Sequence, residues 1–197
     1  MRLALFDFDG TLTSEDSLQH FIIFSIGRWK YIIGLMLLSP ILVSYFLGLI
    51  SNDKAKEILV GYFFKGWSVS SFNEIAERYS LNEIQKIIRP KAMERIEYHQ
   101  ANNDRIIVVS ASLRPWIEPW CRSNKIEVIA TTLQDENGII TGRFSSKNCN
   151  GPEKVVQIRK IVNLESYDKI FAYGDSSGDM EMLELATDDL GFKKLFH

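Results

Sequence analysis

Four aspartates lie in two short polar segments of the chain, each of which directly follows an apolar run. They are Asp7, Asp9, Asp175 and Asp179. Four carboxylates held in one small crevice would repel one another unless a cation neutralised them. A ligand set made only of oxygen atoms, without His or Cys, favours Mg²⁺, which also pairs with phosphate oxygens. The pattern therefore predicts a magnesium site for phosphoryl transfer, a reaction in which a carboxylate is a competent nucleophile.

Buried strands must bring these segments together. Short apolar runs predict strands at Leu3–Phe6, Arg105–Val109, Glu127–Ala130 and Lys169–Tyr173. Helical patterns lie between and after them, at Lys91–Gln100, after Ser112, at Glu153–Val162 and at Met180–Ala186. This alternation predicts an α/β protein whose core is a doubly wound, Rossmann-like parallel sheet. Because such sheets bind ligands at the carboxyl ends of their strands, Ser110 should join the four aspartates there.

Four segments resemble the motifs of the haloacid dehalogenase-like superfamily, in its phosphoserine-phosphatase-like branch (subfamily IB). The segments are Asp7-Phe8-Asp9-Gly10-Thr11, Val108-Val109-Ser110-Ala111-Ser112, Lys154 within Asn148–Lys154, and Gly174-Asp175-Ser176-Ser177-Gly178-Asp179. The resemblance spans nearly the whole chain. It implies a Mg²⁺-dependent phosphatase that works through an aspartyl-phosphate intermediate on Asp7.

The resemblance also implies a role for each motif residue. Asp7 would attack phosphorus, and Asp9 would protonate the leaving oxygen and later activate water. Ser110, the backbone N–H of Ala111 and Lys154 would bind the phosphate. The metal set would be Asp7, Asp9 through its backbone carbonyl, Asp175 and Asp179, with Asp179 either a ligand or a neighbour of the ligands. Thr11 would orient the first loop.

Residues 14–89 interrupt the alternation of strands and helices. Phe72, Ile75, Ala76 and Tyr79 share one face of a predicted helix, and the whole block is expected to be helical. We expect a cap domain at 14–89 over a catalytic core formed by 1–13 and 90–197. Turn residues at 135–138 further predict a small β-hairpin that projects from the core.

The stretch Tyr31–Ile50 contains no charged residue and is long enough to be considered as a membrane span. A single span would place Asp7 and Ser110 on opposite sides of the membrane, so the site could not assemble. Pro40 predicts a break and hence two shorter helices. Two interpretations remain: a hairpin packed on itself and on the core, or a membrane-facing cap, flanked by Arg28, Lys30, Lys54 and Lys56, in peripheral contact through residues 31–50.

The substrate hypotheses follow from this cap. One is a small phosphorylated metabolite such as phosphoserine, whose amine Glu15 or Asp16 could bind. Another is a lipid phosphate, because an apolar cap suits a lipid and the layout resembles that of bacterial phosphatidylglycerophosphate phosphatases. A hypothesis of another class is a non-catalytic membrane- or protein-binding module on a relic scaffold.

Composition limits the remaining classes. The chain has 23 Lys and Arg against 25 Asp and Glu, for a net charge of -2, so we expect no nucleic-acid partner. Cys121 and Cys149 lack the spacing of a metal or redox pair. Asp7 and Asp9 interrupt any apolar leader, so we expect a cytoplasmic protein, with membrane association as the alternative. The three histidines are assigned no role.

Overall fold

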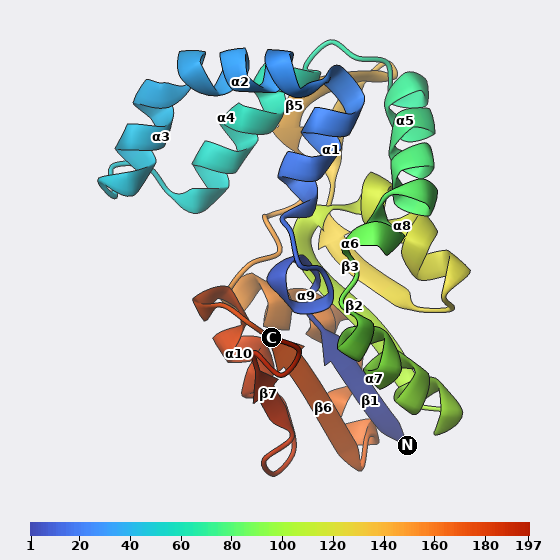
Figure 1. The fold of residues 1–197 in the computed structure, drawn as a ribbon. Helices are drawn as coiled ribbons and strands as arrows, with labels where there is room; N and C mark the ends of the chain where they lie inside the picture. The colour runs from blue at the N-terminus through green and yellow to red at the C-terminus, as the bar shows by residue number, and fades with distance from the viewer.

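Five parallel strands form the central sheet of the computed structural model, which describes residues 1–197 (Figure 1). In sheet order they are β3 (Glu127–Thr131), β2 (Arg105–Leu113), β1 (Arg2–Phe6), β6 (Lys169–Gly174) and β7 (Gly191–Lys193). β1 is central, and Phe6 is in register with Val108 of β2 and Tyr173 of β6. The polar segments that follow β1, β2 and β6 therefore start side by side.

Alternate residues of the strands pack against two helical layers. Ala4 and Phe6 belong to the core formed with α7 (Pro90–Ala101) and α8 (Arg114–Ser123), whereas Leu3 and Leu5 belong to the core on the opposite face. That second core includes side chains of α9 (Pro152–Ile161) and α10 (Met180–Leu183). Two buried layers around one parallel sheet confirm the predicted doubly wound core.

Six helices form the insert that lies between β1 and α7. They are α1 (Ser17–Ile26), α2 (Arg28–Leu37), α3 (Ser39–Phe46), α4 (Asn52–Phe64), α5 (Val69–Asn82) and α6 (Ile84–Ile87). The chain enters and leaves this insert at two adjacent segments, where Thr13 bridges to Ile88 and Arg89 N donates to the Leu12 carbonyl (2.8 Å). We propose that this narrow connection separates a cap, 14–89, from the core.

The predicted antiparallel hairpin is formed by β4 (Leu133–Glu136) and β5 (Ile139–Phe144). It packs on the insert, where Ile140 exchanges backbone hydrogen bonds with Gly66 and Trp67 (both 2.9 Å). Gly142 lies against α4 so closely that a Cβ there would meet the Gly61 Cα at 2.7 Å. The hairpin therefore extends the helical insert, because its apolar Ile140 finds its buried partners there.

The charge-free stretch forms two short helices, as its proline predicts, with α2 ending at Leu37 and α3 beginning at Ser39. Of the two interpretations of this stretch, packing inside the protein accounts for only a minority of its residues. Gly34 and Leu38 are buried, whereas nine large apolar side chains between residues 29 and 49 are exposed. No helix of the structure has both the length and the hydropathy to cross a membrane alone. Only α1 and α2 taken together are long and apolar enough, and the pair is bent by 116°.

The structure near the C-terminus differs from the sequence-based prediction in two ways. α10 ends at Leu183 and not at Ala186, because the chain turns back to place β7 beside β6. β7 was not predicted, since a three-residue edge strand carries no periodic pattern. The remaining short turns are η1 (Phe8–Leu12), η2 (Leu164–Ser166) and η3 (Ser177–Asp179).

A buried polar network ties α7 to the sheet. His99 Nδ1 lies 2.7 Å from Asp104 Oδ2, and its Nε2 lies 2.9 Å from the Tyr173 hydroxyl. Arg2 of β1 also donates to Asp104 (2.7 and 3.0 Å). Burial lowers the pKa of His99 in spite of the opposing effect of Asp104. The neutral ring that donates from Nδ1 and accepts at Nε2 satisfies both partners.

Candidate active site

The first loop of the site leaves the sheet directly at its centre. Asp7 N donates to the Tyr173 carbonyl (2.9 Å), which extends the β1–β6 ladder by one bond before the η1 turn begins. Gly10 adopts a φ of 81°, a conformation that side chains rarely allow, and a Cβ there would lie 2.6 Å from Asp175 Oδ2. Glycine at this position lets the first loop approach the loop after β6.

The three side chains of the predicted metal set, leaving aside the backbone carbonyl of Asp9, come together. Asp7, Asp175 and Asp179 each offer one oxygen, and these atoms lie within 4.8 Å of one another. The Thr11 hydroxyl lies 3.2 Å from Asp7 Oδ2 and 3.3 Å from Asp175 Oδ1, so it spans two of the three side chains. The Thr11 hydroxyl thus links the first loop to the loop after β6.

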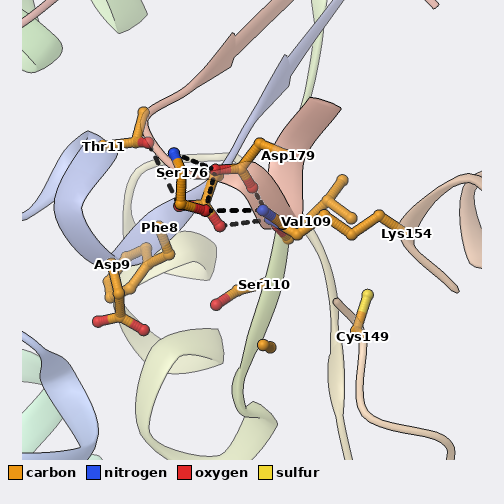
Figure 2. A network of polar contacts seen from close by, with 12 residues as sticks. Phe8, Asp9, Thr11, Val109, Ser110, Cys149, Lys154, Ser176 and Asp179 are labelled. Atoms are coloured by element: carbon orange, nitrogen blue, oxygen red, sulfur yellow. Dashed lines mark hydrogen bonds and ion pairs between the residues drawn. The ribbon is translucent and has the colours of Figure 1, made fainter. Parts of the chain in front are cut away.

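Lys154 extends into the same cluster from α9, which packs on the face of the sheet opposite α7 and α8. Its ammonium donates to Asp7 Oδ1 (2.5 Å), to Asp179 Oδ1 (2.7 Å) and to the Val109 carbonyl (2.9 Å). The side chain is 1 % exposed. Figure 2 shows the ammonium pointing into the group of carboxylates. All three N–H donors of Lys154 are therefore engaged by the protein.

Asp179 is held more firmly than the other carboxylates. Its Oδ2 accepts from the backbone N–H of Asp175 (3.1 Å), and from both the N–H (2.9 Å) and the hydroxyl (2.8 Å) of Ser176. Its Oδ1 accepts from Lys154. With both oxygens engaged, Asp179 fixes the conformation of the loop that carries Asp175.

Asp9 lies apart from the carboxylate cluster. Its Oδ1 accepts from the backbone N–H of Ser17 at the start of α1 (2.7 Å), and its Oδ2 accepts from the Ser112 hydroxyl (2.5 Å). In Figure 2 its carboxylate is turned away from Lys154. No local pattern indicates these partners, because Ser17 belongs to the insert and Ser112 lies 103 positions away from Asp9.

The loop after β2 contains the predicted phosphate-binding residues. The ladder between β2 and β3 shifts register between Ser110 and Leu113, and this irregularity re-aims the chain beside the cluster. Ser110 is buried, and its hydroxyl accepts from Ser112 N (2.9 Å), which leaves its own hydrogen free to donate. The Ala111 carbonyl accepts from Lys56 Nζ of α4 (2.8 Å).

Lys56 is a site residue that sequence reasoning placed elsewhere, among the charges that flank the apolar stretch. It forms no ion pair within 4.0 Å and uses one donor, on Ala111, so two donors remain available. Burial lowers its pKa, while the charges of Asp9 and Asp16 oppose that effect. The contact depends on how α4 packs over the core, which no local pattern indicates.

The pKa values of the two best-buried carboxylates in the cluster, those of Asp7 and Asp179, are shifted in opposite directions. Burial raises the pKa of Asp7 to about 7, even though Lys154 opposes the shift. Burial acts on Asp179 in the same direction, but Lys154 and the hydrogen bonds from Ser176 together hold its pKa below the ordinary value. Burial also raises the pKa of Asp9. Asp7 is therefore the carboxylate that most needs a further cation.

The residues present fit a magnesium ion. The converging donors are oxygens, the one lysine in the cluster is fully engaged, and burial raises the pKa of Asp7 although Lys154 contacts it. A divalent cation among these oxygens would balance the excess negative charge. Asp7, Asp175 and Asp179 are the side chains that could hold it.

Comparison with known proteins identifies the family of this chain. Residues 4–184 match the family of haloacid dehalogenase-like hydrolases. The chain therefore belongs to that family, as the four motifs predict.

Single proteins and solved structures are also similar to this chain. The chain is 32% identical over 194 residues to the protein CicA of Caulobacter vibrioides, which covers 97% of this chain and 85% of CicA. Among solved structures, a protein of unknown function from Bordetella pertussis Tohama I superposes with a TM-score of 0.81 at 24% identity, over 94% of this chain and 87% of the other. A substrate-bound phosphoserine phosphatase gives a TM-score of 0.65 at 18% identity, over 93% and 82%. These two structural similarities concern the fold.

Proposed function

We propose that the protein is a Mg²⁺-dependent phosphomonoester hydrolase that forms an aspartyl-phosphate on Asp7. The observation that carries the proposal is the convergence of Asp7, Asp175, Asp179 and Lys154 at the carboxyl ends of three strands. Phosphoryl transfer depends mainly on positioning and charge neutralisation, and this cluster supplies both.

The reaction divides between the two aspartates of the first loop. An Asp7 carboxylate oxygen attacks phosphorus as the bond to the leaving oxygen breaks, and Asp9 gives that oxygen its proton. Water then attacks the acyl phosphate while Asp9 takes a proton, which releases phosphate and restores Asp7. The raised pKa of Asp9 favours the acid role. To deliver the proton, the Asp9 carboxyl must give up its hydrogen bond with Ser112 and form one with the leaving oxygen.

Other groups bind the phosphoryl oxygens. Ser110 has a free hydroxyl hydrogen, and the Ala111 N–H belongs to the same loop. Lys154 keeps Asp7 in place and adds positive charge beside it. A bound Mg²⁺ would neutralise charge on Asp7 and on the phosphate.

An assay with p-nitrophenyl phosphate tests this function. We expect turnover that requires Mg²⁺, that stops with EDTA, and that falls by at least about a thousandfold in Asp7→Asn. Asp189→Asn, at an exposed position, serves as the matched control. Acid-quenched wild type should carry a phosphoryl group on Asp7. Full activity of Asp7→Asn would refute the mechanism, and a folded wild type that hydrolyses no phosphomonoester would favour the non-catalytic hypothesis.

The substrate that we propose first is a small phosphorylated metabolite such as phosphoserine. Its support is the fold shared with phosphoserine phosphatases, together with Asp16, which lies close enough to Asp9 to affect its pKa and could bind an amine. Phosphoserine should then be hydrolysed faster than p-nitrophenyl phosphate, and Asp16→Asn should reduce that preference.

A second candidate substrate is a lipid phosphate. The exposed apolar side chains between residues 29 and 49 favour it, because α4 follows them directly and its first turns contact the core loops. Asp53 accepts from Asn148 (2.7 Å), and Lys56 donates to Ala111. Rates on phosphatidylglycerophosphate in mixed micelles, measured beside those on phosphoserine, distinguish the two candidates.

A further inference from the structure

The exposed apolar residues of the insert are concentrated in one segment, which we call the apolar arm: residues 29–49, comprising most of α2, all of α3 and the turn after it. Nine of the eighteen large hydrophobic side chains that the whole chain exposes lie here. They are Trp29, Ile33, Met36, Leu37, Val43, Tyr45, Phe46, Leu47 and Leu49. Isolated exposed apolar residues are ordinary, but a contiguous group of this size marks a surface that meets another phase or molecule.

The spacing of these residues gives each helix an apolar face. On α2, Trp29, Ile33 and Met36 follow at i, i+4 and i+7, and on α3, Val43 and Phe46 are three residues apart. Phe46 is 81% exposed and Trp29 is 79% exposed. Figure 1 shows α2 and α3 extending away from the sheet, with α3 and its following turn at the far end of the insert. The arm therefore presents these side chains at the end of the insert that lies away from the sheet.

The charges of this region are all of one sign. Between Ser17 and Asn52 the chain contains no Asp or Glu, and its only Lys and Arg residues are Arg28 and Lys30, both exposed in the first turn of α2. Trp29 lies between them. An amphipathic tryptophan flanked by basic residues, next to an uncharged apolar face, is the composition that locates at an anionic bilayer surface.

We propose that the apolar arm docks the protein on an anionic lipid bilayer, with its apolar side chains among the acyl chains and with Arg28 and Lys30 at the headgroups. Helices of this type lie in the interface at a depth of roughly 5–10 Å. The inference does not depend on the enzymatic activity, because it rests on the surface alone.

Other occupants fit this surface less well. A protein partner would require matched polar groups around an apolar centre, yet the only hydroxyls of the arm besides Tyr31 and Tyr45 are Ser39 and Ser44, and Ser44 donates to its own helix at Pro40 O (2.8 Å). A second copy joined face to face would add two more cations and no anion to pair with them. Hydrocarbon requires no polar partner, and anionic headgroups supply the missing negative charge.

Docking would place the active site beside the membrane surface. Ser51 caps α4 immediately after the arm by accepting from Lys54 N (3.2 Å), and within two turns Asp53 and Lys56 contact the core loops that hold Asn148 and Ala111. The arm and the site are thus connected by one rigid element.

Vesicle co-sedimentation of the full chain tests the proposal. We expect wild type to pellet with vesicles of phosphatidylglycerol and phosphatidylcholine, and to pellet less with phosphatidylcholine alone. Phe46→Glu combined with Leu47→Glu should reduce the partition coefficient by about tenfold or more. Arg28→Gln combined with Lys30→Gln should remove the preference for anionic lipid. Leu81→Glu combined with Leu195→Glu, which adds the same two charges at exposed apolar positions outside the arm, should partition like wild type.

Two further measurements keep the outcome unambiguous. The variants should retain the wild-type rate on p-nitrophenyl phosphate, which shows that they are folded and that docking and catalysis are separate. Light scattering at micromolar concentration should give a monomer without lipid. Wild type that stays in the supernatant with anionic vesicles overturns the proposal, and a dimer that the Phe46→Glu, Leu47→Glu change dissociates would assign the arm to a second copy.

Discussion

At the scale of single residues, Lys154 is the group whose removal the site can least tolerate. It is the only cation in contact with Asp7 and Asp179, and all three residues are buried. Without Mg²⁺, Lys154→Gln should reduce the free energy of unfolding by about 3–5 kcal/mol, because it leaves two adjacent carboxylates unpaired. Urea unfolding measures the loss, and added Mg²⁺ should recover part of it. Lys160→Gln, exposed on the same helix, is the control, and equal stability of the two variants would contradict the assignment.

Lys56 differs from Lys154 because its donors are free. Lys154 donates all three of its N–H hydrogens to protein oxygens. Lys56 donates only one, to Ala111, so it is the ammonium at the site with hydrogens available to an anionic substrate. Lys56→Gln should therefore raise KM by about tenfold or more and change kcat less. Steady-state kinetics on the best phosphomonoester provide the measurement. Lys54→Gln, whose lysine is exposed and pairs with Glu57, should behave like wild type, and an unchanged KM in Lys56→Gln would exclude the contact.

At the scale of elements, the position of α2 depends on a glycine. A Cβ on Gly34 would lie 2.4 Å from the Phe63 ring and 2.8 Å from Tyr62, so α2 can cross α4 this closely only without a side chain there. Gly34→Leu should separate the two helices at a cost of about 1–3 kcal/mol. Limited proteolysis should cut the segment 27–51 several-fold faster, while the exposed change Ile33→Leu should have no effect. A wild-type cleavage rate in Gly34→Leu would show that the crossing is not tight.

At the scale of the whole molecule, His99 links folding stability to pH. Burial keeps the pKa of His99 below the ordinary 6.5. Below about pH 6.5 this histidine therefore binds a proton more readily in the unfolded chain than in the folded protein. This contribution is fully present at higher pH and declines as the pH falls, by at most about 1.4 kcal/mol per pH unit. We expect His99→Gln to cost about 2–3 kcal/mol at pH 7.5, from the unpaired Asp104 and Tyr173, and less at pH 5.5. Urea unfolding at both pH values measures the difference; a cost that grows toward pH 5.5 would mean that the folded ring is charged.

The sequence predicted those parts of the molecule that local patterns encode. Apolar runs that stop at Asp7, Ser110 and Asp175 located three strand ends, and strands that are parallel and adjacent bring those ends to one edge. Pro40 indicated the division of the charge-free stretch into two helices. Spacing and residue type were sufficient for these features because each depends on a few neighbouring residues.

Only the tertiary structure decided which groups face one another across the chain. The contacts of Asp9 with Ser112, of Lys56 with Ala111 and of the β4–β5 hairpin with α4 join segments far apart in sequence. The exposure of the apolar arm was equally undetermined, because an apolar face looks the same in a sequence whether another helix covers it or none does. Local periodicity specifies that a face exists, whereas the packing of distant elements specifies what covers it.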